Sequence, residues 1–209
     1  MLIMYLEFVQ KKKQTYFAEF VLKSGEHVLG EFSLSGQLGD REGLITGHAG
    51  ADKIMMSAAS EDDGAEKKAF RTYGIWRNDV AVGKIRQRES EGSLFHKYYY
   101  LELELPEASF SLYSIGLGHE GAVFPLYIGD RQIAQLEKDC IMFNDLHSFR
   151  IYCASEEDGA IAAMFCLFMY VNGGYKPGKK SLRFKSSVLG LTTNKELLDK
   201  YDPDFLSNL

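Results

Sequence analysis

Most of the chain alternates between apolar and polar residues with a period of two. In residues 98–105 the leucines fall on one side of the backbone, whereas Glu102 and Glu104 fall on the other. This alternation is typical of an antiparallel strand with one buried face. Further strand-like segments lie at residues 1–9, 15–22, 27–34, 53–58, 70–76, 79–88, 108–115, 121–128, 131–138 and 148–154.

Turn-forming residues separate these segments, at positions 23–25, 77–79, 106–107 and 129–131. No amphipathic helix intervenes between the strands, so the pattern predicts an antiparallel meander that closes into a sandwich or a barrel. No linker rich in proline or serine divides the sequence. We therefore expect a single domain over residues 1–209, in which residues 190–209 form a C-terminal helical tail.

Residues 160–171 differ from the rest because all twelve are apolar. Their alanine, methionine and leucine residues favour a helix. Ser155 and Asp158 form a variant of the capping box before it, and Gly173 and Gly174 can end it. Twelve residues rise about 18 Å, whereas crossing the core of a bilayer takes about 20 residues, so we expect no transmembrane span.

A helix that is apolar on every face must be enclosed. Burial of its eight larger side chains contributes on the order of 10–20 kcal/mol as an upper bound, comparable to the net stability of a whole domain. The simplest arrangement places the helix inside the strands. We therefore predict a mainly β fold, a closed antiparallel β-barrel around a central hydrophobic α-helix near the C-terminus. A helix that fills the barrel argues against an internal ligand cavity.

This order of elements resembles the tubby C-terminal-like superfamily. The resemblance rests on the run of strands, the acidic turn at 155–158 and the apolar helix that ends at residues 172–174. Hairpins at 73–84 and 127–138 each place an isoleucine, a turn aspartate and a small residue alike, and they resemble the phospholipid scramblase and LURP-one-related branch most. The resemblance implies a barrel of about 12 strands and an interaction with membrane phospholipid or phosphoinositide. The chain lacks the Pro-rich or Cys-rich N-terminal region of many scramblase-type chains, which argues against palmitoyl anchoring and lipid transport.

The charges of the chain are unevenly distributed. A net charge of −5 argues against dedicated nucleic-acid binding. Residues 172–187 nevertheless contain five cations and no carboxylate, which makes them the predicted contact for an anionic ligand. The alternative is an ordinary strand edge whose lysines discourage edge pairing. Lys11, Lys12 and Lys13 would extend the basic patch if a barrel brings the two segments together. The predicted anionic-ligand-binding residues are Lys176, Lys179, Lys180, Arg183 and Lys185.

Motifs for catalysis or cofactors are weak. Residues 116–121 match G-x-G-x-x-G, but the strand-like sequence around Pro125 follows where a dinucleotide site needs a helix. The five histidines are scattered, and the acidic runs at 61–63 and 156–158 lack the alternating ligands of a calcium loop. We predict no enzyme activity, no catalytic residues, no cofactor and no metal site.

The three cysteines include no C-x-x-C pair, and the positive charges at 11–13 follow the apolar N-terminus rather than precede it. Both features favour a reducing cytoplasm over secretion. We therefore expect a non-enzymatic intracellular binding domain that contacts an anionic membrane surface or phosphoinositide. Two alternatives stay open. One is a small-molecule-binding protein or enzyme with its site at the barrel mouth. The other is a protein-interaction scaffold that uses residues 194–209.

Overall fold

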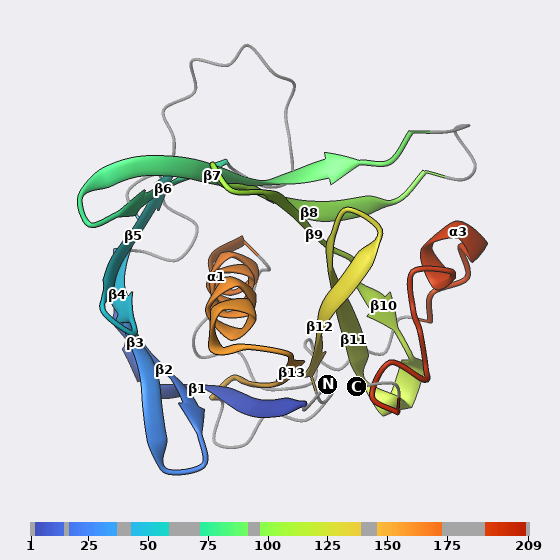
Figure 1. The fold of residues 1–209 in the computed structure, drawn as a ribbon, viewed down its shortest axis with the longest axis horizontal. Helices are drawn as coiled ribbons and strands as arrows, with labels where there is room; N and C mark the ends of the chain where they lie inside the picture. The colour runs from blue at the N-terminus through green and yellow to red at the C-terminus, as the bar shows by residue number, and fades with distance from the viewer. Residues whose placement is uncertain are drawn as a thin grey trace.

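The computed structural model describes residues 3–14, 17–36, 43–58, 72–91, 97–138, 146–172 and 191–207. All of its strand pairings are antiparallel, as Figure 1 shows. The strands are β1 (Met4–Gln14), β2 (Phe17–Ser24), β3 (His27–Ser35), β4 (Leu44–Ala49), β5 (Asp52–Ala58), β6 (Tyr73–Arg77), β7 (Val80–Glu89), β8 (Tyr99–Glu104), β9 (Ser109–Leu112), β10 (Ile115–Gly116), β11 (Ala122–Ile128), β12 (Arg131–Lys138) and β13 (Ser148–Cys153).

The sheet closes through the strand β11. Its second half pairs with β9 and its first half with the two-residue strand β10. Between them the amide of Tyr113 donates to the carbonyl of Pro125 at 3.1 Å, so β9 and β10 lie along the same side of β11. The order β9–β11–β12–β13–β1 and onward to β8 therefore forms a closed barrel of twelve strands, with β10 as a short addition. The predicted barrel is confirmed.

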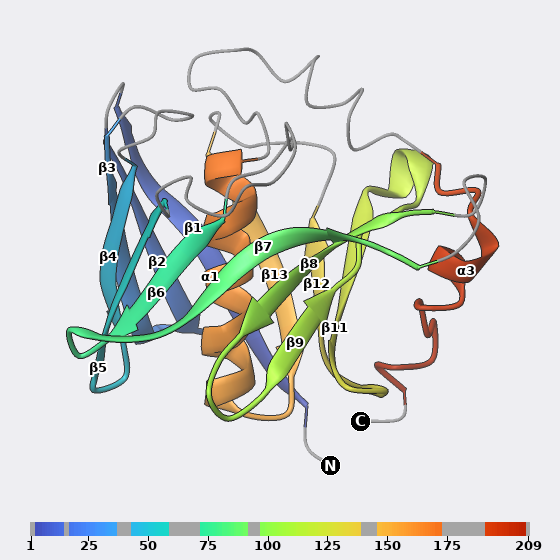
Figure 2. The same ribbon diagram turned by 90° about the horizontal axis from the view of Figure 1, so that it is seen from above.

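The helix α1 (Glu156–Asn172) runs through the barrel, as Figure 2 shows. Ser155 caps it, because the Ser155 hydroxyl accepts from the amide of Asp158 at 3.1 Å and donates to its carboxylate at 2.8 Å. Every side chain from Ile161 to Val171 is buried. A twelve-stranded barrel is wider than the eight-stranded barrels that side chains alone can fill, so the helix supplies the missing core. No described helix is long and apolar enough to cross a membrane.

Strand β4 was not expected from the sequence. Ile45 is its only fully buried residue, and Thr46, Gly47 and His48 interrupt any apolar alternation. Gly47 is needed there, because a Cβ atom at this position would lie 2.2 Å from the backbone oxygen of Glu31 in the neighbouring strand. Tertiary packing therefore defines this strand where the sequence pattern does not.

The two ends of the barrel differ. The turns β2–β3, β4–β5 and β6–β7 are short and lie at the end where α1 begins, which we call the turn end. At the opposite end, α1 finishes beside the last residues of β1, where the hydroxyl of Tyr170 accepts a hydrogen bond from Gln10 Nε2 at 3.0 Å. We call this the helix-exit end. The short turns of the turn end follow one another along the lower edge of the barrel in Figure 2.

The C-terminal segment packs on the outside of the barrel (Figure 1). The amide of Thr192 donates to the carbonyl of Gly116 at 3.0 Å, and the Tyr127 hydroxyl donates to the carbonyl of Lys200 at 3.1 Å. Within residues 191–207, regular helix covers α3 (Lys195–Leu198), and turns follow it. Leu197 and Phe205 are buried against the barrel.

Candidate functional site

The five predicted cations at positions 176, 179, 180, 183 and 185 lie outside the described residues. The structure does describe where their segment begins, since α1 ends with Asn172 at the helix-exit end. The side-chain Nδ2 of Asn172 donates to the backbone carbonyl of Phe168 at 3.1 Å, which satisfies one acceptor of the last turn. The other residues that form the helix-exit end belong to β1, to β12 and to the start of β13.

A β-bulge near the end of β1 arranges the three consecutive lysines. The register with β2 shifts between Gln10 and Lys12, which leaves Lys11 as the extra residue. Lys12 pairs with Glu19 on the outer face, whereas Lys13 pairs with the inward-facing Ala18. Lys11 and Lys12 are exposed, and Lys13 is half-buried at the rim of the barrel. The bulge therefore directs lysines to both faces of the rim.

Polar side chains fill the barrel just below this rim. Gln10 is buried and forms two hydrogen bonds with His147, the residue before β13. Its side-chain Oε1 accepts from the backbone amide of His147 at 3.1 Å, and its backbone amide donates to the His147 carbonyl at 2.8 Å. Its Nε2 donates to Tyr170 of α1. The His147 and Tyr170 rings meet edge to face at 5.2 Å. The helix is thereby held to the barrel wall by hydrogen bonds as well as by apolar contacts.

A lysine from another strand, β12, lies inside the barrel at this end. Lys138, at the end of β12, is only 3% exposed. Its Nζ donates to the carbonyl of Ser148 at 3.2 Å and lies 4.2 Å from the ring centre of Phe149. The pKa of His147 falls to about 2, because burial disfavours its charged form and the positive charges of Lys138 and Lys13 add to that effect. His147 is therefore a neutral side chain in an electropositive environment.

The turn end contains a cavity of about 220 Å³ between α1 and the wall formed by β2 to β6. Its inner surface is apolar and is formed by Leu22, Leu29, Phe32, Ile54, Ile161 and Met164. The helix packs most extensively against β13, β12 and β1, on the opposite side of the barrel. The expectation that α1 leaves no room for an internal cavity was therefore wrong, because the helix lies off-centre.

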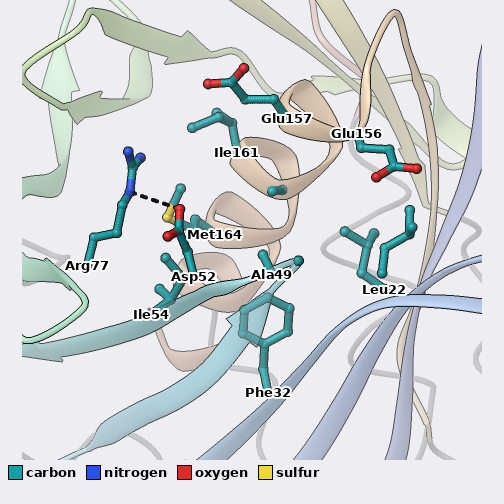
Figure 3. A pocket seen from close by; sticks show the side chains of 13 residues that line it. Leu22, Phe32, Ala49, Asp52, Ile54, Arg77, Glu156, Glu157, Ile161 and Met164 are labelled. Atoms are coloured by element: carbon teal, nitrogen blue, oxygen red, sulfur yellow. Dashed lines mark ion pairs between the residues drawn. The ribbon is translucent and has the colours of Figure 1, made fainter.

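Charged side chains surround the mouth of this cavity, as Figure 3 shows. Arg77 Nε lies 3.8 Å from Asp52 Oδ2, and its Nη2 lies 3.0 Å from Glu107 Oε1. The other oxygen of Asp52 accepts from Asn78 Nδ2 at 2.9 Å. Glu156 and Glu157, in the first turn of α1, are exposed and form no ion pair with a described residue. The mouth is therefore net negative.

Sequence reasoning did not identify the residues of either end as a group. The cavity-lining residues come from five strands and the helix, so no spacing along the chain connects them. Gln10 is likewise more than 120 residues away from Lys138 and His147 in the sequence, and the three meet through the pairing of β1 with β13 and of β12 with β13. The single available signal was polar residues at inward-facing strand positions.

The remaining candidate motifs do not form a site in the described residues. The glycine-rich segment 116–121 leads through a single 3-10 turn (Gly118–Glu120) directly into β11, without the helix that a dinucleotide would need. Burial raises the pKa of the Cys153 thiol to about 12 and also raises that of Cys166, so both are protonated at neutral pH. No group of three histidine, cysteine or carboxylate side chains could hold a metal within the part of the chain described.

No protein family, curated protein or solved structure matches this chain. The resemblance to the tubby C-terminal-like superfamily therefore stays a prediction, although the barrel and central helix that it implied are present.

Proposed function

We propose that this chain is a non-enzymatic intracellular binding domain that contacts anionic phospholipid headgroups, phosphoinositides included, at the helix-exit end of the barrel. The observation that carries the proposal is the convergence of lysines at this end. Lys11, Lys12 and Lys13 lie on the rim, Lys138 lies just inside it, and α1 ends there. The carboxylate-free segment with Lys176, Lys179, Lys180, Arg183 and Lys185 follows directly in the sequence.

Electrostatics support the proposal. Each lysine or arginine near an anionic membrane surface contributes about 1 kcal/mol of binding free energy at physiological salt. Burial is the main cause of the low pKa of His147, and the positive charges of Lys138 and Lys13 lower that pKa further, as expected if the two lysines act together at this end. An anionic headgroup would reduce the mutual repulsion of these lysines, whereas a neutral headgroup would not.

Vesicle sedimentation tests the proposal. Neutral phosphatidylcholine vesicles are compared with vesicles that also contain phosphatidylserine or a phosphoinositide. We expect the K11Q/K12Q variant to bind anionic vesicles about 30-fold more weakly, since two cations contribute about 2 kcal/mol. The matched control is K23Q/K53Q, which removes two cations near the turns β2–β3 and β4–β5 and is expected to bind within twofold of the wild type.

Two outcomes contradict the proposal. The first is equal recovery of the wild-type protein on neutral and anionic vesicles at low salt. The second is an equal loss of binding in K11Q/K12Q and in K23Q/K53Q, because that result would indicate a response to total charge rather than to the helix-exit end. One further variant tests the adjoining segment by replacing all five of its cations, at positions 176, 179, 180, 183 and 185, with glutamine. This variant is expected to lose binding to anionic vesicles altogether.

A further inference from the structure

We propose a second site, beyond the proposed function: the cavity at the turn end binds a small amphiphile with a cationic head and a short unbranched apolar chain. The chain would lie between α1 and the wall of β2 to β6, and the head would lie at the mouth beside Glu156 and Glu157. An alkylammonium ion represents this chemical class. The inference rests on the cavity and on the distribution of charge around its mouth (Figure 3).

The interior of the cavity is suited to an apolar chain. Leu22 and Phe32 from the wall, and Ile161 and Met164 from the helix, are at most 4% exposed and offer no hydrogen-bonding groups. Water inside such a space lacks the two to four polar partners that it needs, so an apolar group gains free energy by replacing it. The deep part of the site therefore favours hydrocarbon.

The size of the cavity limits the ligand. Its volume of about 220 Å³ is below the roughly 300–1,000 Å³ of pockets that enclose drug-sized molecules. A branched or polycyclic ligand would need the wall to move. A narrow chain whose polar head stays at the mouth fits without such a movement.

The charge at the mouth selects the head. Arg77 is already matched by the carboxylates of Asp52 and Glu107, so it offers no unopposed positive charge to a ligand. Glu156 and Glu157 add two negative charges, and the partial positive charge of the helix N-terminus, about half an elementary charge, offsets only part of them. A carboxylate head would be repelled, whereas an ammonium head would be attracted.

The arrangement of the mouth also reduces the cost of binding. Asn78 fixes one oxygen of Asp52, and the capping bonds of Ser155 fix the first turn of α1. The charged groups around the cavity are therefore attached to ordered backbone before a ligand arrives, which lowers the entropy lost on binding.

Isothermal titration with three eight-carbon probes below their micelle concentrations tests the site. The probes are n-octylammonium, n-octanol and n-octanoate, and they differ only in the head. We expect the order of affinity to be octylammonium, then octanol, then octanoate, with at least a tenfold difference between the first and the last. In the E156Q/E157Q variant this difference is expected to fall to threefold or less, because the unopposed charges are gone.

Matched variants locate the binding. E19Q/E31Q removes two carboxylates from strand positions that do not line the cavity, and it is expected to keep the wild-type preference. A160L adds bulk to the helix side of the cavity and is expected to weaken all three probes at least fivefold. If that variant fails to fold, A49L adds bulk from the wall and provides the same test.

The proposal is overturned if octylammonium does not bind, if octanoate binds as tightly, or if A160L and A49L bind octylammonium like the wild type. The proposal is also overturned if E156Q/E157Q and E19Q/E31Q reduce the preference for octylammonium over octanoate by the same factor. Vesicle sedimentation of A160L separates this proposal from the first, since loss of the turn-end cavity is expected to leave binding at the helix-exit end unchanged.

Discussion

The two ends of this barrel are formed by the same strands, but the space around α1 is filled differently at each end. At the helix-exit end, polar groups fill the space around α1, and Gln10, Tyr170 and His147 join the helix to the wall. At the turn end the helix leaves a gap beside β2 to β6, and apolar side chains line it. One end is packed and positively charged inside, whereas the other is partly open and negatively charged at its mouth.

The orientation of α1 connects these differences. Its first turn carries Glu156, Glu157 and Asp158, which interact favourably with the positive end of the helix dipole. Its last turn carries no acidic or basic residue, and lysines of the surrounding strands lie near the negative end instead. The helix thus favours carboxylates at one mouth and cations at the other, and two ligands of opposite charge can be expected at opposite ends.

The largest difference between the two ends is expected in core stability. Phe168 is fully buried and its ring meets that of Tyr73 edge to face at 5.8 Å. Phe168→Ala is expected to lower the free energy of unfolding by about 3–5 kcal/mol, because a closed site cannot collapse around the void. Met164 lies against the existing cavity, so Met164→Ala is expected to cost only about 2 kcal/mol, the low end of the range for such truncations. Urea unfolding of both variants measures these values.

Equal losses in the two variants would contradict this comparison, since they would mean that α1 is packed as tightly at the turn end as along the rest of its length. Met169→Ala provides the control, because Met169 has the same side chain as Met164, is similarly buried and does not line the cavity. Met169→Ala is expected to lower the free energy of unfolding by more than Met164→Ala does.

The barrel could be predicted because its signals are local. Alternation marked the strands that bury several side chains, and the twelve apolar residues of 160–171 required an enclosing structure whatever the strand order. Strand β4 was missed because it buries only Ile45 fully and carries Gly47 at its centre. Its place in the sheet depends on the neighbouring strands, which a period along the chain does not reveal.

The sites could be predicted far less well, since both depend on which strands become neighbours. The bulge at Lys11 determines that Lys13 shares a face with Ala18, and nothing in the run Lys11–Lys13 signals it. The cavity depends on the off-centre position of α1, and the uniformly apolar helix contains no pattern that would set that position. Identical hydrophobicity on every face predicts burial without predicting which wall the helix approaches.

The next effect concerns pH and belongs to the helix-exit end. The pKa of His147 is about 2 in the folded state against about 6.5 when unfolded. The unfolded state therefore binds the extra proton, so stability is fully present above pH 6.5 and is lost as the pH falls below it. From this residue alone, the free energy of unfolding is expected to fall by about 2–3 kcal/mol between pH 6.5 and pH 4.5.

Urea unfolding at several pH values, for the wild type and His147→Gln, isolates this contribution from that of the carboxylates. The difference between the two curves is expected to have a slope approaching 1.4 kcal/mol per pH unit below pH 6. His48→Gln is the matched control, because it removes an exposed histidine on the outside of the barrel, where His48 lies 3.7 Å from Glu31. Parallel curves for His147→Gln and the wild type would show that His147 is accessible to protons in the folded barrel.

The smallest effect concerns the short turns of the turn end. Asn78 has a positive φ of 52°, a conformation that asparagine tolerates better than most residues. Its Oδ1 accepts from the amide of Lys53 at 2.9 Å, and its Nδ2 donates to Asp52 at the cavity mouth. Asn78→Ala is expected to cost about 1–2 kcal/mol in free energy of unfolding, because it adds strain and removes both bonds.

Asn78→Gly separates these two causes, since glycine adopts the same φ without strain but forms neither side-chain bond. It is expected to cost about 0.5–1 kcal/mol, half or less of the effect of alanine. Because Asn78 also orients Asp52, both variants are expected to weaken octylammonium binding by a similar factor of two to three while leaving vesicle binding unchanged. A loss of vesicle binding in Asn78→Gly would mean that the two ends are coupled through the barrel rather than independent.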